Sequence, residues 1–193
     1  SDTYFVVGHF HMVMGVSPIL VIFGAIYHWY PKITGRMLND RLGRIHFWAT
    51  LFGTYAIYLP MHYLGILGLP RRYYTMGDTS FIPDSAQVMN AGISVAALFV
   101  SLVQLIFLFN LFWSRTHGKP SGSNPWKATT LEWQTPQTPP KHGNWGPDLP
   151  LVYRWAYDYS VPGAAQDYIP QTMAPQDVPT SDASYHGGEG EHS

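Results

Sequence analysis

The stretch TYFVVGHFHMVMGVSPILVIFGAIYHWYP, residues 3–31, contains no Asp, Glu, Lys or Arg. A helix that crosses a bilayer needs about 20 consecutive and mainly apolar residues, so this run is long enough. Gly15, Ser17 and Pro18 lie near its middle, where membrane helices tolerate such residues. The aromatic end at residues 27–30 is typical of a membrane–water interface. We predict that residues 3–31 span a membrane as one helix.

Two further uncharged runs follow the first, and they predict helices over about 45–69 and 85–113. Charged residues make up 12% of the chain, whereas soluble domains contain about 25%. The predicted fold class is therefore an all-α membrane protein. Residues 1–113 form a three-helix transmembrane part of a larger helical bundle.

The composition changes after residue 113. Eleven of the sixteen prolines lie in residues 114–193, and no helical or strand periodicity is sustained there. We predict an extended, Pro-rich tail that is partly disordered at its end. Four tryptophans in this tail indicate that much of it packs against other protein surface. They are Trp126, Trp133, Trp145 and Trp155.

The amino-acid composition also excludes several kinds of metal and redox site. The chain has no cysteine, which excludes disulfides, iron–sulfur clusters, thiolate zinc sites and covalent c-type haem attachment. The net charge is −1 and there is no basic run, so nothing points to a nucleic-acid partner. The uncharged run begins at residue 3, and we expect the chain to be one part of a longer or split subunit.

The positive residues predict an orientation in the membrane. The predicted link between the second and third helices carries only two positive residues, Arg71 and Arg72. The first link and the start of the tail carry more, namely Lys32, Arg36, Arg41, Arg44, Arg115, Lys119 and Lys127. The positive-inside rule then puts the tail on the cytoplasmic side, and Arg71, Arg72 and the start of the first helix on the outer side.

The first helix contains Gly8-His9-Phe10-His11. On an α-helix, residues i and i+2 lie about 200° apart around the axis and about 3 Å apart along it. His9 and His11 cannot chelate one ion from these positions, but each can hold a separate haem iron, with Phe10 between the two haems. The alternative is that each imidazole only forms a hydrogen bond to a neighbouring helix.

The arginine pair lies on the same predicted side of the membrane as these histidines, since His9 is about 9 Å below the outer end of its helix. Arginine binds carboxylates in bidentate fashion, so Arg71 and Arg72 suit the two propionates of a haem. The alternative is a positive anchor at the membrane interface. His62 lies near the outer end of the second helix, where it either supports the haem site through a hydrogen bond or only packs.

Several motifs together resemble the C-terminal part of subunit I of the haem–copper terminal oxidases, of the cytochrome c oxidase type. The resemblance covers helices ten to twelve and the inner-side tail of bacterial members, over residues 2 to about 145. The motifs are DTYFVVGHFH at 2–11, HWYP at 28–31, RIHF at 44–47, PMHYLG at 60–65, LPRRY at 69–73, NPW at 124–126 and TLEW at 130–133.

The resemblance implies a role for each matching residue. His9 would be the axial ligand of a high-spin haem that faces copper and oxygen, and His11 would be one of two axial ligands of a low-spin haem. Phe10 would lie between the haems, and the resemblance implies that these are a-type haems. Arg71 and Arg72 would hold propionates.

One motif departs from the family at the outer surface. The resemblance implies that Asp2 lies near the propionates and a magnesium ion. The family usually has His directly before this Asp, whereas this chain has Ser1, so the magnesium site is in doubt.

The resemblance implies an enzyme that reduces oxygen to water and pumps protons, located in the bacterial inner membrane as a multi-pass protein. About twelve helices form the whole subunit, so the copper ligands lie outside this chain, which would be inactive alone. The implied partners are the remaining helices, oxidase subunits II and III, membrane lipids, and cytochrome c as electron donor.

Other hypotheses remain open at this point. The chain could belong to a membrane di-haem cytochrome b that only transfers electrons, or it could be a non-catalytic scaffold or assembly subunit. A quinol is the alternative electron donor, although Asp2-Thr3 favours cytochrome c. Nitric oxide reductases share the two-haem helix and differ in metal ligands that are not in this chain.

Overall fold

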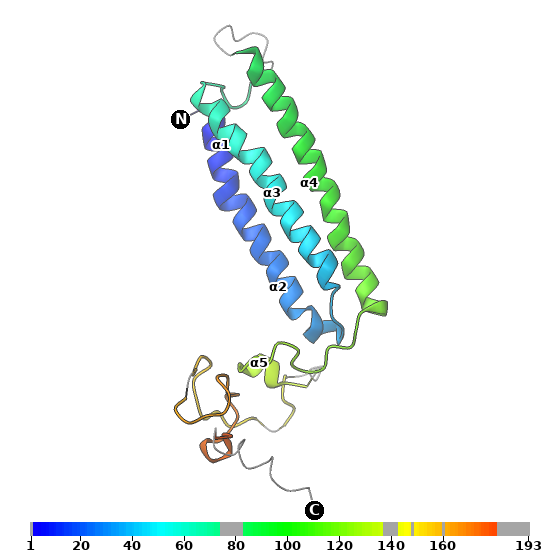
Figure 1. Cartoon of the computed structure of the whole chain (residues 1–193), viewed down its shortest axis with the longest axis vertical. Helices are drawn as coiled ribbons and strands as arrows, with labels where there is room; N and C mark the ends of the chain where they lie inside the picture. The colour runs from blue at the N-terminus through cyan, green and yellow to red at the C-terminus, as the bar shows by residue number, and fades with distance from the viewer. Residues whose placement is uncertain (1, 74–82, 137–142, 148, 160, 181–193) are drawn as a thin grey trace, which may run out of the picture. The chain divides into compact units, whose positions relative to one another are not determined.

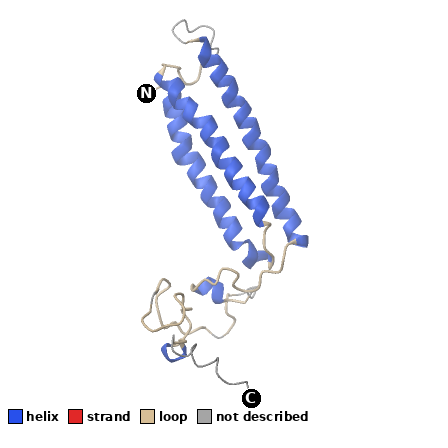
Figure 2. Cartoon of the chain, viewed as in Figure 1, coloured by secondary structure: helices blue, strands red, loops and turns tan. Residues whose placement is uncertain are grey.

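The computed structural model of the chain describes residues 2–73, 83–136, 143–147, 149–159 and 161–180. Over these residues the protein is mainly helical and contains no strand, which confirms the all-α prediction (Figure 2). The helices are α1 (Tyr4–Phe10), η1 (His11–Val16), α2 (Ser17–Thr34), α3 (Asp40–Ile66), α4 (Asp84–His117), α5 (Leu131–Gln134) and η2 (Pro175–Asp177).

The chain forms two compact units. The first consists of the described parts of Ser1–His28 and Leu38–Gly118, and the second of Trp29–Met37 with the described parts of Lys119–Ser193. In the first unit, α3 lies between α1 and α4 (Figure 1).

The first long helix runs over Tyr4–Thr34 and contains one turn of π-helix, η1. Pro18 follows this turn. Proline lacks an N–H and its ring clashes with the carbonyl four residues earlier, so a wider turn relieves the conflict. The hydroxyl of Ser17 also donates to the carbonyl of Met12, five residues earlier, at 3.3 Å. The π turn begins at His11, the second histidine of the two-histidine motif.

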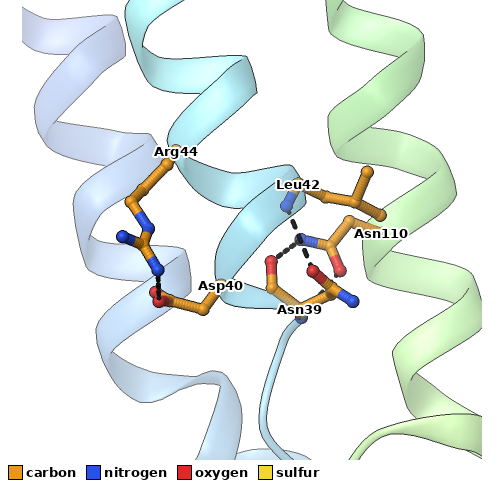
Figure 3. Close-up of polar contacts among 5 residues, drawn as sticks. All are labelled: Asn39, Asp40, Leu42, Arg44 and Asn110. Atoms are coloured by element: carbon orange, nitrogen blue, oxygen red, sulfur yellow. Dashed lines mark hydrogen bonds and ion pairs between the residues drawn. The ribbon is translucent and has the colours of Figure 1, made fainter.

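Helix α3 begins at Asp40, five residues before the predicted start at about 45. Asn39 caps it, because its side-chain oxygen accepts a hydrogen bond from Leu42 N at 3.1 Å (Figure 3). Asp40 in the first turn is favourable at the positive end of the helix, and it pairs with Arg44 at 2.7 Å. The charged residues that the uncharged-run criterion excluded are thus part of the helix.

Helix α4 starts at Asp84, close to its predicted start, and ends at His117, four residues after its predicted end. Its Asn110 is fully buried and binds the backbone of Asn39 twice. Asn39 N donates to Asn110 Oδ1 at 2.9 Å, and Asn110 Nδ2 donates to Asn39 O at 3.0 Å (Figure 3). Ser114 adds a third bond to Asn110 Oδ1 at 2.9 Å. One buried amide therefore ties the start of α3 to α4.

We expect Asn110→Ala to destabilise the protein by about 1–3 kcal/mol, because it leaves buried backbone groups of Asn39 without partners. Arg44→Ala is the matched control. It removes a solvent-exposed i, i+4 ion pair, which contributes about 0.3–0.5 kcal/mol. Thermal unfolding of the purified membrane complex that contains this chain measures both. Equal losses in the two variants would contradict the assignment of Asn110.

Two helices are long and apolar enough to span a membrane by length and composition, Tyr4–Thr34 and Asp84–His117. Within the described residues, little of either helix is buried. On α4, for example, Val95, Leu98 and Leu102 are all largely exposed. Helix α3, with 27 residues, lies between these two helices. Such uncovered apolar faces are typical of helices surrounded by lipid or by further helices.

The second unit is organised around two side chains. Lys32 donates to Thr135 O at 2.8 Å and lies 5.6 Å from the centre of the buried Trp133 ring. Gln171 binds two segments through three hydrogen bonds: its N donates to Thr129 O, its Oε1 accepts from Leu131 N, and its O accepts from Tyr153 N. The described tail therefore has specific structure, although it is almost free of helices.

Candidate functional site

The start of α1 pairs with the loop that follows α3. Tyr4 N donates to Leu69 O at 2.9 Å, and Arg71 N donates to Asp2 O at 3.0 Å. Thr3 and Pro70 form an isolated antiparallel bridge between these two bonds. The backbone thus brings Asp2 and the arginine loop to the same end of the bundle as the two-histidine motif.

Two glycines allow α1 and α3 to approach closely. A Cβ atom at Gly8 would lie 3.0 Å from Tyr58 O and 2.9 Å from His62 Nδ1, both on α3. A Cβ atom at Gly65 would lie 2.6 Å from Cα of Phe5, on α1. Both glycines are buried. The position of the histidine motif against α3 therefore depends on the absence of side chains at these two positions.

His9 and His11 lie on the two sides of this contact. Since Gly8 faces α3 and each residue rotates the chain by about 100°, His9 is about 100° to one side and His11 about 60° to the other. The rings of both are near α3: the centres of His9 and His62 are 6.4 Å apart, and His11 stacks on Tyr58 at 5.4 Å. Both histidines are exposed in the described chain. The two imidazoles thus point into different spaces beside one helix.

One ring nitrogen of His11 is already occupied. Nδ1 lies 2.8 Å from Val7 O, and a carbonyl oxygen only accepts, so Nδ1 carries the proton. The neutral ring then has its lone pair on Nε2. A histidine held in this way is typical of metal ligation, because the bond at one nitrogen orients the other.

His62 is fixed by its own helix. Its Nδ1 lies 2.7 Å from Tyr58 O, and its ring packs edge-on against Phe5 at 4.9 Å. The ring is therefore held between Phe5 and His9. Tyr58, one turn away on the same face of α3, is a site neighbour that sequence reasoning missed. Its position four residues before His62 was the available signal.

Phe10 is 56% exposed, and its ring lies edge-on to His11 with centres 5.6 Å apart. It projects from the helix between the directions of the two histidines, away from α3. Nothing in the described chain covers most of this side chain, and so its ring is available to groups on either side.

The charged residues of the site form one ion pair. Arg71 and Asp2 are 2.5 Å apart, with Arg71 partly buried. Arginine has five N–H donors, so this contact leaves others for a second anion. Arg72 is exposed and has a positive φ of 61°. This left-handed conformation is uncommon for a residue with a Cβ atom and turns the chain sharply between Arg71 and Tyr73.

An apolar groove of about 330 Å³ lies beside the π turn, between η1 with the start of α2 and the middle of α3. The residues that line it are Met12, Val13, Val16, Ser17, Leu20, Leu51, Thr54 and Tyr55. The first of these residues in the sequence, Met12, directly follows His11.

The described residues contain no group of three or more His, Cys, Asp or Glu that could hold a metal ion together. The donor chemistry of the site fits iron in a haem instead, because the porphyrin supplies four ligands and each histidine needs to supply only one. The hydrogen bond at His11 Nδ1, and the positions of the two histidines on different sides of one helix, agree with this use.

Known proteins match this chain closely. Residues 1–121 match the family described as cytochrome c and quinol oxidase polypeptide I. An alternative cytochrome c oxidase subunit 1 of Bradyrhizobium diazoefficiens is 70% identical over 175 residues, which cover 91% of this chain and 30% of that protein. The cytochrome c oxidase subunit 1 of Thermostichus vulcanus is 44% identical over 160 residues, which cover 83% of this chain and 28% of that protein.

The chain thus spans about three tenths of the length of these curated relatives. The family match covers the predicted helices and the first residues of the tail, and it confirms the resemblance that the motifs indicated. This chain belongs to the cytochrome c and quinol oxidase polypeptide I family.

Proposed function

We propose that this chain is the haem-ligating C-terminal part of the catalytic subunit of a respiratory cytochrome c oxidase. The observation that carries the proposal is the geometry of the Gly8–His11 turn. His9 and His11 lie on opposite sides of one helix by its periodicity, and His11 Nδ1 is bonded to Val7 O, which leaves Nε2 as the nitrogen that can bind a metal. Family membership and the names of the relatives support the same function.

In this proposal the two histidines differ in whether the haem iron that they bind keeps a coordination position free for oxygen. His9 is the only protein ligand of a high-spin haem, and His11 is one of two protein ligands of a low-spin haem. Haem iron with one protein ligand has an open position for oxygen, whereas iron with two histidines only transfers electrons. Phe10 fills the space between the two haem sites, and His62 supports the ring of His9 through packing.

Arg71 and Arg72 bind haem propionates at the outer end of the site. The ion pair with Asp2 orients the Arg71 guanidinium and keeps it near that end. Asp2 is also the candidate ligand of a magnesium ion, with Ser1 where the family has His. A hydroxyl is a weaker metal ligand than an imidazole, so we expect magnesium to bind weakly.

The groove beside η1 supports an a-type haem. Such a haem carries a long apolar chain, and the groove is lined mainly by Met, Val and Leu side chains. The groove starts next to His11, so it suits the haem that His11 binds.

The rest of the site comes from elsewhere. The remaining helices of subunit I supply the copper ligands and the second low-spin ligand, and subunits II and III complete the complex. The exposed apolar faces of α2 and α4 are available to these helices and to lipid. We propose the bacterial inner membrane as the location, with the tail on the cytoplasmic side, cytochrome c as donor, and proton pumping coupled to oxygen reduction.

Oxygen uptake by the purified complex that contains this chain tests the proposal. We expect uptake with reduced cytochrome c, inhibition by cyanide, and a-type haem on extraction. Uptake only with a quinol would replace the donor and leave the oxidase function. A complex that contains haem and consumes no oxygen with either donor would contradict the oxidase function and favour an electron-transfer cytochrome.

A further inference from the structure

The described part of the loop that carries Arg71 and Arg72, residues 69–73, is held at both of its ends. At its start, the backbone bonds of Leu69 and Arg71 to the segment before α1 hold it. At its end, the hydroxyl of Tyr73 lies 3.1 Å from the hydroxyl of Tyr4 and accepts a hydrogen bond from Asn90 Nδ2 at 3.0 Å. The second anchor joins three segments that are far apart in sequence: α1, the loop and α4.

Tyr73 is well suited to hold this position. Its ring lies 5.6 Å from that of Tyr4 and packs against the buried cluster that includes Leu64 and Leu69. Its hydroxyl accepts a hydrogen bond from Asn90 and can donate one to Tyr4, so the hydroxyl is used both as an acceptor and as a donor. Asn90 projects from the second turn of α4, a long helix that does not depend on the loop.

The residue between the two anchors is strained. Arg72 has φ of 61°, and a non-glycine residue keeps such a conformation only where the structure on both sides holds it. Without the Tyr73 anchor, the chain can relax toward a negative φ at Arg72. That relaxation would redirect the side chains of Arg71 and Arg72.

We propose that Tyr73, held by Asn90 and Tyr4, is a positioning residue that sets where the two guanidinium groups lie. The effect on the haem midpoint potential rests on the proposed function, in which the two guanidinium groups bind haem propionates. This positioning role makes Tyr73 and Asn90 determinants of the haem midpoint potential, although neither is proposed to touch a haem.

The expected size follows from Coulomb's law. We take an effective dielectric constant of about 20. Moving one positive charge from about 4 Å to about 6 Å from a carboxylate then lowers the equilibrium constant for their association by about tenfold. A less neutralised propionate stabilises the oxidised haem. Only the part of this change that differs between oxidised and reduced haem shifts the midpoint potential, so the ratio of reduced to oxidised haem at a fixed potential should fall by less than about tenfold, which is below about 59 mV for one electron.

The test is Tyr73→Phe in the intact complex, with Tyr63→Phe as the matched control. Tyr63 is 52% exposed on α3 and loses the same hydroxyl at a position outside the site. Two quantities are measured, the haem midpoint potential by redox titration and the hydrogen-exchange rate of the Arg71 amide. Loss of one typical hydrogen bond should speed exchange by about two- to tenfold.

We expect Tyr73→Phe to lower the midpoint potential and to speed exchange, and Asn90→Leu to do the same. Tyr63→Phe should change neither. If Tyr73→Phe speeds exchange without moving the potential, or leaves both at the Tyr63→Phe values, the proposal is wrong. If the wild-type complex held no haem, the proposed function would fail, and the exchange rate would still decide whether Tyr73 fixes the loop.

Discussion

Replacing His11 by alanine is expected to remove the low-spin haem signal and to leave the high-spin signal, while His9→Ala is expected to do the reverse. Each variant should retain about half the haem of the wild-type complex. The reason is that the two rings point to opposite sides of the helix, so neither histidine can substitute for the other. Electron paramagnetic resonance and the ratio of haem to protein measure the outcome on the purified complex.

The matched control is His117→Ala. His117 is an exposed histidine at the end of α4, and its loss removes an imidazole from a position that has no role in the proposed site. It should leave both signals in place. Loss of both haems from His9→Ala and from His11→Ala alike would mean that the histidines support the fold and do not hold separate haems.

Gly65→Ala is expected to disrupt the whole site at once. A Cβ atom at this position would lie 2.6 Å from Phe5 Cα, and the backbone of a helix cannot move aside as a flexible side chain can. Overpacking of this kind typically costs about 1–3 kcal/mol, and a backbone contact leaves less room for relief. We expect α1 to shift on α3, so that both haem signals and much of the assembled complex are lost.

Gly92→Ala is the control for this variant. Gly92 is also a helical glycine, on α4, and a Cβ atom there meets no atom within 4 Å. Alanine should stabilise that helix by up to about 1 kcal/mol or leave it unchanged. Comparison of haem content and of the yield of intact complex separates the two effects. Full haem content in Gly65→Ala would contradict the close approach of α1 and α3.

Much of the helical fold is readable from the uncharged runs, since a bilayer-length run without charge has few other uses. The helix ends were harder to predict. Helix α3 begins with Asp40, Arg41 and Arg44, because a cap at Asn39 and a buried amide at Asn110 allow a charged first turn. The π turn at His11–Val16 has no periodic signal in the sequence, although Pro18 marks its place.

The candidate site was predictable only in part. The spacing of His9 and His11 and the pair Arg71-Arg72 could be recognised, because their chemistry shows in the residue types. The roles assigned to them remain proposals. The contacts of Gly8, Gly65 and Tyr73 depend on which segments meet in space, and a local pattern in one sequence carries no record of such long-range contacts.

The most direct test of the account is a reduced-minus-oxidised spectrum, with and without carbon monoxide, of the complex isolated from membranes through this chain. We expect two haems, one that binds carbon monoxide and one that does not, because in the proposed function His9 would leave an open iron position and His11 would share its iron with a second histidine. A spectrum with no haem, or with only haem insensitive to carbon monoxide, would contradict it.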